Sequence, residues 1–493
     1  MQLAKLLKDI LSIPPAVDRD ITRLVLDSRE IRQGDLFLAI AGTHLDGRRY
    51  IVDAIARGAA AVLIASDHPQ AMITTEADVP IVPVHQLKAL LGQLSASFFD
   101  YPAKKMQMIG ITGTSGKTSC THFIGQVLQN LSIPCGLIGT LGSGFYGDLH
   151  ETGLTTPDAV KLQTTLHDLW SQGAKAISME VSSHSIDQGR INAIDFDLGI
   201  FTNVSQDHLD YHGDMAAYAA VKRRFLAEFP IKQLIINVDD VHGQQWLLEL
   251  APTKKVLAYS TMGHAPIAPA IPLVTAKNVS LSLKGMHAVI DTPWGRGELS
   301  LSLIGQFNLS NALAALSALC LYGIPFETVL QQLAALKPVP GRMQTLVRKG
   351  KPLVVVDYAH KPDALAKALE ALRKHTKGRL ICVFGCGGER DSQKRPIMGK
   401  IAETLADRVI ITNDNPRHED PASIAQQILQ GMINQDRVSV ELDRSKAIKN
   451  SIQWAKENDC ILIAGKGAEH YQLVGDKKLP FDDVDVALSC LDN

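Results

Sequence analysis

The sequence lacks most features that mark a membrane, secreted or nucleic-acid-binding protein. Aromatic residues make up only 5% of its 493 residues, which disfavours a stacking surface for single-stranded nucleic acid. The formal net charge of −1 argues against a strongly cationic nucleic-acid binder. The longest apolar stretch, around residues 312–324, is too short and too interrupted to span a bilayer. We therefore expect a soluble protein with no membrane insertion and no nucleic-acid partner.

Cysteines are few and scattered. The seven cysteines form no C-x-x-C pair, and such an odd set is typical of a reduced, cytoplasmic protein without a disulfide framework or a zinc site. The first residues, MQLAKLLKDILSIPP, carry an acidic residue inside a short apolar stretch and no small-residue cleavage site. They predict an amphipathic first helix and not a signal peptide.

The length predicts about three domains at roughly 150 residues each. Hydrophobic residues at 46% and charged residues at 20% are ordinary for globular domains with sizeable cores. In the first part, short apolar runs at 23–27, 35–42, 59–65 and 79–84 alternate with a helical pattern at 50–58 and predict a small α/β unit. Proline and paired lysines near 102–105, and the LKPVPGR stretch, predict domains at 1–102, 103–337 and 338–493.

The middle part begins with the apolar run MQMIGIT at 106–112 and continues through several strand–helix alternations. From about 254 to 303 apolar and polar residues alternate, as they do in antiparallel hairpins. We therefore expect an α/β domain with an added β-rich region.

The last part has the clearest pattern. Four apolar runs, at 352–360, 379–388, 408–417 and 460–469, each end in polar or glycine-rich residues, and helical patterns follow the first three. This pattern predicts a parallel, doubly wound sheet, in which ligands bind at the carboxyl ends of the strands. Asp357 and the loops at 385–390, 414–417 and 465–469 should therefore share one rim.

A glycine-containing loop joins a predicted strand to a predicted helix in the stretch MIGITGTSGKTSCTHFIGQVL. Backbone N–H groups in such a loop bind phosphates, with Lys117 reaching the β- and γ-phosphates and the Thr118 hydroxyl binding Mg²⁺. Ile111 stands where a strict Walker A motif has glycine. The alternative is a plain helix-capping turn.

Three other features are ambiguous on their own. Glu180 ends an apolar run and could hold Mg²⁺, or it could be a solvated carboxylate. His208 and His212 stand four residues apart, a spacing found in capped turns as well as in metal sites. Lys222, in a helical pattern, is locally indistinguishable from the arginines beside it.

Together these motifs carry a family resemblance. The glycine loop, MEVSSH, DHLDYHG, YAAVK, GQFNLSNALAA, GRM, DYAHKPDAL, FGCGGERD, DNPR and AGKGAE occur in the order found in Mur ligases. Within that family the chain is most similar to the UDP-N-acetylmuramoyl-tripeptide synthetases, over essentially its whole length. The resemblance implies a three-domain α/β enzyme, monomeric and cytoplasmic, that uses ATP and Mg²⁺.

The implied reaction adds meso-diaminopimelate to UDP-MurNAc-L-Ala-D-Glu in the synthesis of peptidoglycan precursors. ATP phosphorylates the D-glutamate carboxylate, and an amine attacks the resulting acyl phosphate with release of ADP and phosphate. Phosphoryl transfer needs positioning and charge neutralisation, which Lys117, Mg²⁺ and Arg342 could supply.

The resemblance also implies residue roles. The implied catalytic residues are Lys117, His208, Lys222 and Arg342. The implied metal ligands are Thr118 and Glu180 for one Mg²⁺, and His208 and a carbamylated Lys222 for a second. The implied ATP-binding residues are Gly113, Thr114, Ser115, Gly116, Lys117, Thr118, Ser119, Asn311, Arg342 and Asp357, with His360 nearby. The implied residues for the UDP-sugar substrate are Leu26, Ser28, Thr43, His44, Leu45, Thr155, Thr156, Ser182, Gln188 and Arg190. Leu26 and Leu45 are core residues on type alone.

The amino-acid substrate is implied to meet the rim of the last domain. The guanidinium of Arg417 can bind a carboxylate through two hydrogen bonds. Diaminopimelate has a distal ammonium and carboxylate, whereas lysine has only the ammonium, and in the family the Asp-Asn-Pro-Arg motif accompanies diaminopimelate. The implied residues are Arg390, Asp414, Asn415, Pro416, Arg417, Gly465 and Glu469.

The chain departs from the family pattern at three positions. Ser115 stands where Asn is usual in the glycine loop, Leu154 where close relatives have Asn, and Ala468 where a His often precedes Glu469. These departures could change the loop's hydrogen bonds, one substrate contact and one side of the amino-acid pocket.

Two other functions are possible. The first is folylpolyglutamate synthetase, a relative that adds glutamate, although the LDSREIRQGDLF segment argues against it. The second is a P-loop switch or kinase; the absence of an N-K-x-D motif and the presence of the third domain argue against it.

Overall fold

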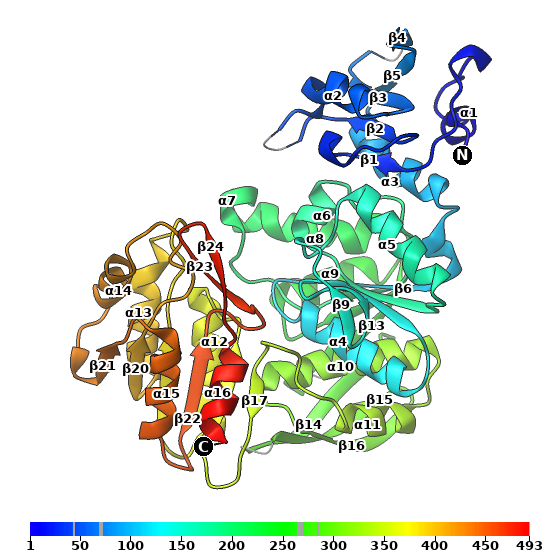
Figure 1. Ribbon diagram of the computed structural model, residues 1–493. Helices are drawn as coiled ribbons and strands as arrows, with labels where there is room; N and C mark the ends of the chain where they lie inside the picture. The colour runs from blue at the N-terminus through cyan, green and yellow to red at the C-terminus, as the bar shows by residue number, and fades with distance from the viewer. Residues whose placement is uncertain (43–44, 69–71, 264–267, 269, 283–284, 493) are drawn as a thin grey trace.

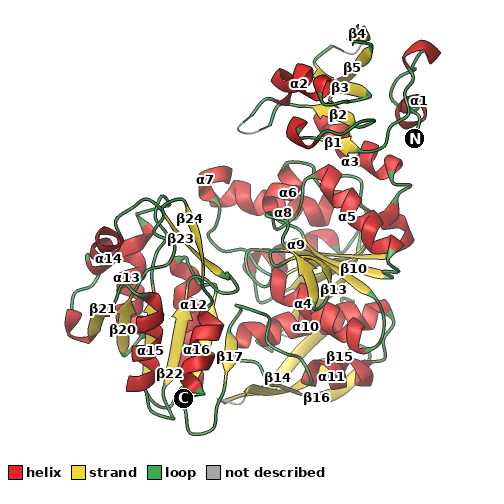
Figure 2. Cartoon of the chain, in the orientation of Figure 1, coloured by secondary structure: helices red, strands yellow, loops and turns green. Residues whose placement is uncertain are grey.

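The computed structural model describes residues 1–42, 45–68, 72–263, 268, 270–282 and 285–492. These residues form three units, each built on one main sheet (Figures 1 and 2). In Figure 1 the N-terminal unit (blue) lies above the central unit (cyan to green), and the C-terminal unit (yellow to red) lies to the left of the central one. Within the described residues, no helix is long and apolar enough to cross a membrane.

The N-terminal unit has five strands in the order β1-β2-β3-β5-β4 among its described residues, with only β4 antiparallel to its neighbour. Its elements are α1 (Leu3–Leu7), β1 (Leu24–Val25), β2 (Leu36–Ala39), α2 (Ile51–Ala56), β3 (Ala61–Ser66), β4 (Thr74–Glu76), β5 (Val79–His85) and α3 (Leu87–Phe98). The predicted first helix and the four predicted strands are therefore present. Helix α3 packs against α5 (Ala159–Ser171) of the central unit.

The central sheet has the order β16-β15-β14-β13-β12-β11-β6-β10-β7-β8-β9. Its strands are β6 (Gln107–Thr112), β7 (Cys135–Gly139), β8 (Gly142–Phe145), β9 (Asp148–His150), β10 (Ala176–Glu180), β11 (Phe196–Phe201), β12 (Ile231–Asn237), β13 (Lys255–Ser260), β14 (Leu273–Ser282), β15 (Gly285–Thr292) and β16 (Gly295–Leu301). Its other helices are α4 (Lys117–Asn130), α6 (Ser183–Asp187), α7 (Leu209–His212), α8 (Met215–Glu228), α9 (Val241–Leu250), α10 (Gln306–Tyr322) and α11 (Phe326–Ala334). Strands β14, β15 and β16 pair antiparallel, which confirms the predicted hairpins.

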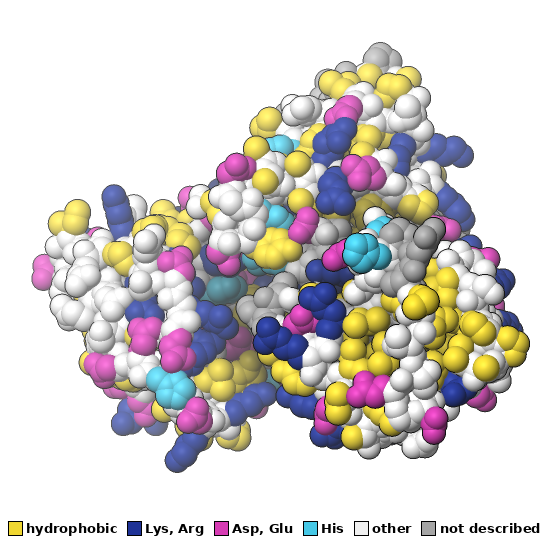
Figure 3. Space-filling view, turned by 90° about the horizontal axis from the view of Figure 1, so that it is seen from above, with side chains coloured by type: hydrophobic (Ala, Val, Ile, Leu, Met, Phe, Trp, Pro, Cys, Tyr) yellow, Lys and Arg dark blue, Asp and Glu magenta, His cyan; other side chains and the backbone are white. Residues whose placement is uncertain are grey.

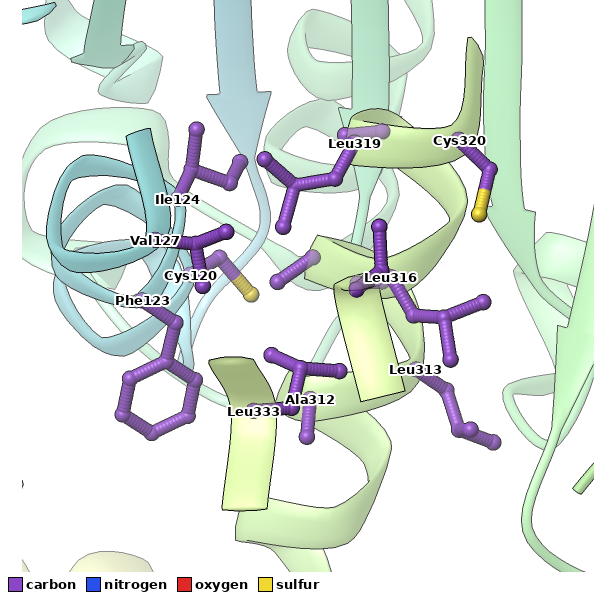
Figure 4. Close-up of a cluster of buried hydrophobic side chains, with 14 of the residues drawn as sticks. Cys120, Phe123, Ile124, Val127, Ala312, Leu313, Leu316, Leu319, Cys320 and Leu333 are labelled. Atoms are coloured by element: carbon purple, nitrogen blue, oxygen red, sulfur yellow. The ribbon is translucent and has the colours of Figure 1, made fainter. Parts of the chain in front are cut away.

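Helices α4 and α10 pack together beside this sheet. Figure 4 shows Cys120 and Val127 of α4 beside Leu316 and Leu319 of α10, with Phe123 of α4 and Leu333 of α11 at the lower end of the same cluster. The whole of α10 is apolar apart from a few small polar residues, because it is covered on nearly all sides. This packing fixes α10 beside the loop that begins α4.

The C-terminal unit has the strand order β17-β18-β22-β19-β20-β21, and only β17 runs antiparallel to its neighbour. Its strands are β17 (Gln344–Leu346), β18 (Leu353–Asp357), β19 (Leu380–Phe384), β20 (Arg408–Ile411), β21 (Val438–Val440), β22 (Cys460–Ala464) and the separate hairpin β23 (Tyr471–Val474) and β24 (Lys477–Pro480). Its helices are α12 (Pro362–His375), α13 (Lys394–Leu405), α14 (Pro421–Leu429), α15 (Arg444–Trp454) and α16 (Asp483–Leu491). Strands β19 and β22 are buried throughout because helices cover both faces, which explains their unbroken apolar sequence. The predicted doubly wound parallel sheet is confirmed.

Candidate active site

The loop between β6 and α4 requires glycine at two positions. Gly113 and Gly116 have φ angles of +144° and +91°, in a region that favours glycine. A Cβ on Gly113 would lie 1.9 Å from Thr202 Oγ1, and one on Gly116 would lie 2.4 Å from Asn311 Oδ1. The backbone thus passes close to both side chains before α4 begins. The first N–H groups of α4 then point out of the helix, an arrangement that favours anions.

Hydrogen bonds to the backbone of Ser115 hold this loop in shape. Ser115 N–H donates to Asn203 Oδ1 (3.0 Å), and Asn203 Nδ2 donates back to Ser115 O (3.0 Å). Thr202 Oγ1 also donates to Ser115 O, at 2.6 Å. Because all three bonds use main-chain atoms of Ser115, the departure from Asn at this position leaves them in place.

Two lysines converge on one carbonyl oxygen of the loop. Lys117 Nζ donates to Gly113 O at 2.8 Å, and Lys222 Nζ, from α8, donates to the same oxygen at 2.9 Å. Lys222 is almost completely buried. Burial lowers the pKa of both amines, and for Lys222 the neighbouring Lys117 lowers it further, to well below the usual value. The structure therefore singles out Lys222 from Arg223 and Arg224, which local sequence could not do.

Carboxylate and hydroxyl oxygens lie beside the loop. Glu180 ends β10, which pairs with β6, and its carboxylate is buried and accepts from Thr140 N–H (2.8 Å) and Thr140 Oγ1 (3.2 Å). Thr140 Oγ1 also lies 3.1 Å from Thr155 Oγ1, and Thr118 is buried in the first turn of α4. A hydroxyl and a carboxylate are the oxygen donors that Mg²⁺ prefers when phosphates and waters complete its shell. The donor set therefore fits Mg²⁺.

Three histidines cluster next to this site. The ring of His184 lies 4.8 Å from that of His208 and 5.6 Å from that of His212, centre to centre. His208 is the N-cap residue of α7 with a φ of +52°, and His212 Nε2 lies 3.0 Å from Ser183 Oγ. Burial lowers the pKa of His208 to about 4, so its imidazole is neutral at pH 7. Across the described part of the chain, no three His, Cys, Asp or Glu residues are arranged to hold a metal by themselves.

Side-chain contacts join the central and C-terminal units. Lys361, just before α12, forms an ion pair with Asp207 of the central unit. Burial alone would raise the pKa of Asp207, but the charge of Lys361 and its hydrogen bond bring that pKa below the usual value. His375 Nδ1 lies 2.6 Å from Ser282 O, and its Nε2 accepts from Gly305 N–H (3.2 Å). The space-filling view shows Lys and Arg side chains around the hollow near the middle of the face seen from above (Figure 3).

The residues predicted to contact adenosine come from both units. Asn311 is buried on α10 against Gly116. Asp357 ends β18, and burial raises its pKa although Arg342 lowers it. The Arg342 guanidinium lies 4.7 Å from the centre of the Tyr358 ring. Burial also lowers the pKa of His360 to about 4.

Arg417 has an unusual backbone and a well-defined side chain. Its φ is +52°, which is uncommon outside glycine, and its Nη1 donates to Gly388 O at 2.7 Å. A Cβ on Gly388 would lie 1.9 Å from Pro416 O, so only glycine allows this approach. A Cβ on Gly387 would lie 3.1 Å from Arg417 Nη1 and 3.7 Å from Arg390 Cγ. Both arginines therefore border the same stretch of backbone.

The loops after β20 and β22 contact each other on the same rim as these arginines. Asn415 Nδ2 donates to Glu469 Oε2 at 2.9 Å, and Gly465 N–H donates to Asp357 O at 3.1 Å. A Cβ on Gly465 would lie 3.2 Å from Asp414 Oδ2. The four loops expected at the carboxyl ends of the strands thus lie together, with carboxylate and guanidinium groups on one rim.

Another group of predicted residues lies around the end of β10. Thr156 Oγ1 donates to Glu180 O (2.8 Å) and lies 3.3 Å from Ser182 Oγ. Arg190 donates to Thr156 O (2.7 Å) through Nη1 and to Gln188 Oε1 (2.6 Å) through Nη2. These side chains form one connected hydrogen-bonded group at the carboxyl end of β10.

The remaining predicted substrate residues lie in the N-terminal unit. Leu26 packs against that unit's core, Ser28 is buried, and Leu45 is 64% exposed, so Leu45 is not a core residue. Thr43 and His44 lie outside the described residues. Leu26, Ser28 and Leu45 therefore lie in a different unit from the hydrogen-bonded group around β10.

Comparison with known proteins places the whole chain in one family. Residues 20–99 match the Mur ligase family catalytic domain, residues 111–319 the Mur ligase middle domain, and residues 341–467 the glutamate ligase domain of Mur ligases. A UDP-N-acetylmuramoyl-L-alanyl-D-glutamate–2,6-diaminopimelate ligase of Coxiella burnetii is 46% identical over 96% of both chains. The chain belongs to the Mur ligase family. The enzyme of the same name from Pseudomonas aeruginosa is 44% identical, again over 96% of both chains.

Solved structures agree with this membership. A UDP-N-acetylmuramoyl-L-alanyl-D-glutamate–2,6-diaminopimelate ligase matches this Mur ligase with a TM-score of 0.70 and 33% identity over 96% of this chain and 95% of the other. The MurF ligase of Thermotoga maritima in complex with ADP shares the fold, with a TM-score of 0.64 at 19% identity over 97% of this chain and 98% of the other.

Several titratable residues of this Mur ligase were not assigned any role from the sequence. Asp207, Lys361 and His184 are partly buried residues inside quoted motifs, yet their contacts span different motifs and depend on tertiary packing. Lys466 lies in the predicted AGKGAE loop and is completely buried. The only sequence signal that could have marked Lys466 as a functional residue is its place in a loop that follows a strand of the predicted parallel sheet.

The rim of the Mur ligase C-terminal unit rests on a buried arginine. Arg444, at the start of α15, and Asp483, at the start of α16, are both fully buried and pair at 2.7 Å. Arg444 also donates to Asn413 O and to Ala464 O, each at 3.1 Å. These carbonyls immediately precede Asp414 and Gly465. The Arg444 guanidinium therefore holds both loops through these backbone carbonyls.

We predict that Arg444→Met lowers the free energy of unfolding by about 3–5 kcal/mol, because it leaves Asp483 buried without a partner. The double variant Arg444→Met/Asp483→Leu should lose less stability, because no buried charge is left unpaired. Thermal denaturation of the wild type, both single variants and the double variant measures the difference. Equal losses in the single and double variants would contradict the assignment.

Proposed function

We propose that the chain is an ATP-dependent ligase that adds meso-diaminopimelate to UDP-MurNAc-L-Ala-D-Glu, in the synthesis of peptidoglycan precursors. The relatives that carry this activity in their names support the proposal. The observation that carries it is the glycine loop with two converging lysines in the central unit, together with a rim of the C-terminal unit that offers both a guanidinium and a carboxylate. We further propose that the enzyme is a cytoplasmic monomer with domains at 1–102, 103–337 and 338–493.

The reaction has two bond-forming steps. An oxygen of the D-glutamate carboxylate attacks the γ-phosphorus of ATP, and the bond to the leaving ADP oxygen breaks. The amine of diaminopimelate then attacks the carboxyl carbon, loses a proton, and expels phosphate. Lys117 and Arg342 neutralise the negative charge that the first step spreads over the phosphate oxygens.

Burial makes Lys222 suited to carbamylation. Its lowered pKa leaves a fraction of the amine unprotonated, and that lone pair can attack CO₂ to form an N–C bond with loss of a proton. The resulting anion removes the repulsion between Lys222 and Lys117. It also converts a cation into an anionic oxygen donor.

Mg²⁺ fits this arrangement. We propose that Thr118 and Glu180 hold one ion and that His208 and carbamylated Lys222 serve a second. When bound, Mg²⁺ shields the phosphate charges and holds the phosphates against the loop. The chain's own part is to orient the Glu180 carboxylate through its two hydrogen bonds from Thr140.

ATP is proposed to lie between the central and C-terminal units. Asn311 would contact adenine, Asp357 the ribose and Arg342 the phosphates. The phosphates would contact the loop and first helical turn at Gly113, Thr114, Ser115, Gly116, Lys117, Thr118 and Ser119. The ion pair between Lys361 and Asp207 supports this placement, because it holds the two units together beside the loop.

The UDP-sugar substrate is proposed to bind between the N-terminal and central units. The connected group formed by Thr156, Ser182, Gln188 and Arg190 would bind it on the central side, together with Thr155. The N-terminal side would be Leu26, Ser28, Thr43, His44 and Leu45. Leu154 is 47% exposed beside this group, so the lost Asn contact concerns a solvent-facing position.

Diaminopimelate is proposed to bind the rim of the C-terminal unit. Arg417 and Arg390 would bind its distal carboxylate, Glu469 its distal ammonium, and Gly465 the ammonium through its carbonyl. Asp414, Asn415 and Pro416 would shape the loop. L-Lysine lacks the carboxylate and would leave a guanidinium without its partner, at a cost of about 1–3 kcal/mol.

We predict that ATP hydrolysis requires both UDP-MurNAc-L-Ala-D-Glu and meso-diaminopimelate, because the acyl phosphate forms only on a bound carboxylate and turns over only with an amine. Phosphate release measured with each amino acid in turn checks this. Full activity with L-lysine and none with diaminopimelate would overturn the assigned specificity.

We predict that Arg417→Lys raises KM for diaminopimelate by about tenfold or more while ATP binding is unchanged, since an ammonium cannot make the paired hydrogen bonds of a guanidinium. Steady-state kinetics with each substrate varied in turn give the two constants. Arg437→Lys, on the exposed edge of the same sheet, is the matched control. An unchanged KM for diaminopimelate in Arg417→Lys would refute the role.

We predict that Lys222→Ala abolishes activity and that added bicarbonate does not restore it, because alanine has no amine to carbamylate. The exposed neighbour Arg223→Ala, which loses only a pair with Glu249, should remain active. Phosphate release with and without bicarbonate is the measurement. A fully active Lys222→Ala enzyme would show that carbamylation is unnecessary.

A further inference from the structure

Lys466 is a fully buried cation inside the rim of the C-terminal unit. It follows Gly465 in the loop after β22, and its side chain has no exposed surface. Its Nζ lies 3.0 Å from Asn415 Oδ1, 3.1 Å from Glu469 Oε2 and 3.5 Å from Asp414 Oδ1. A buried ammonium is costly unless it is paired and hydrogen-bonded, and here it has three oxygen partners from two different loops.

The ammonium sets the orientation of the Asn415 amide. Asn415 Oδ1 accepts from Lys466 Nζ and from Leu473 N–H (3.0 Å), so both of its lone pairs are used. The amide nitrogen must then point the other way, where it donates to Glu469 Oε2 at 2.9 Å. A flipped amide would place its N–H groups against an ammonium and a backbone N–H. Lys466 therefore excludes the flipped state.

The same contacts orient Glu469. Its Oε2 accepts from both Lys466 and Asn415. In the part of the chain that the structure describes, Oε1 has no hydrogen bond of its own, which leaves it for an incoming donor. Hydrogen bonds therefore hold the Glu469 carboxylate at Oε2, and Oε1 is left to accept a hydrogen bond.

Lys466 also keeps two carboxylates together. Asp414 and Glu469 approach the same ammonium from the loops after β20 and β22, and their negative charges would otherwise repel. The two anions and one cation leave this trio with a net charge of −1. That charge matches one ammonium group of an amino acid.

The other charged groups facing the trio are engaged elsewhere. Arg444 pairs with Asp483 below it, and Arg417 donates to Gly388 O. The Tyr471 ring lies 5.6 Å from Lys466 Nζ, centre to ammonium. Lys394 donates to His360 O. Lys466 is therefore the ammonium that directly contacts both carboxylates.

We propose that Lys466 is a positioning residue for the amino-acid substrate: it locks the Asn415 amide and holds Glu469 so that Oε1 can accept the substrate's distal ammonium. This inference rests on the proposed function, since it assigns to Lys466 the specificity of the same site. Lys466 does not touch the reacting carboxyl group. It acts through Asn415 and Glu469.

The test is Lys466→Met, which keeps the length and apolar stem and removes the charge. KM for meso-diaminopimelate should rise by about tenfold or more, the equivalent of losing hydrogen bonds to a charged group. KM for ATP and for UDP-MurNAc-L-Ala-D-Glu should stay within about twofold. Lys446→Met, at an exposed lysine of α15, is the matched control and should leave all three constants unchanged.

Removing one carboxylate should partly repair the defect. The double variant Lys466→Met/Asp414→Asn keeps the net charge of −1, so its KM for diaminopimelate should fall below that of Lys466→Met. If Lys466→Met does not fold, as judged by thermal denaturation, the double variant is compared with Asp414→Asn alone. The double variant should have a higher KM for diaminopimelate than Asp414→Asn, because Asn415 has still lost the hydrogen bond from Lys466.

Three results would overturn the inference. The first is a folded Lys466→Met enzyme with wild-type KM for diaminopimelate. The second is a double variant whose KM for diaminopimelate equals that of Asp414→Asn. The third is an equal rise in all three constants with no repair by Asp414→Asn, which would indicate a structural role only. The proposed function fails separately, if the wild-type enzyme releases no phosphate in response to diaminopimelate.

Discussion

The structure depends on the convergence of two amines on a single carbonyl oxygen. Lys117 and Lys222 both donate to Gly113 O, at 2.8 and 2.9 Å. Two ammonium groups so placed repel, and only an anion or the loss of one charge relieves the repulsion. The groups proposed at this site relieve this repulsion, because phosphates, a carbamate and carboxylates are all anions. The glycines of the loop matter because they bring this carbonyl within reach.

The parallel sheets explain how distant segments contribute to one site. In the central unit β6, β10 and β11 all end beside the same loop, and in the C-terminal unit β18, β19, β20 and β22 end on one rim. Loops at the carboxyl ends of such strands carry the ligand-binding residues. The ion pair of Lys361 with Asp207 brings one set of strand ends to the other. Phosphate chemistry and amino-acid recognition can therefore be supplied by separate units.

Sequence patterns predicted much of this arrangement, for identifiable reasons. The strand–loop–helix at Lys117 and the four apolar runs of the last unit have strong periodicity and glycine punctuation, and both were found in the structure. Strands β17 and β21 and the hairpin β23–β24 are short and partly exposed, and no pattern indicated them. The burial of Lys466 and Arg444 could not be predicted, because a lysine or an arginine is usually solvated and only tertiary packing decides otherwise.

The pairing of Arg444 with Asp483 has a genetic consequence. Asp483 begins α16, the last helix of the described chain, and through Arg444 it holds the carbonyls before Asp414 and Gly465. A nonsense allele that removes α16 would leave every residue of the amino-acid rim encoded, yet it would take away the anion that fixes Arg444 beneath them. Such an allele would behave as a defect in substrate choice as well as in folding, although the lost codons specify no proposed ligand contact.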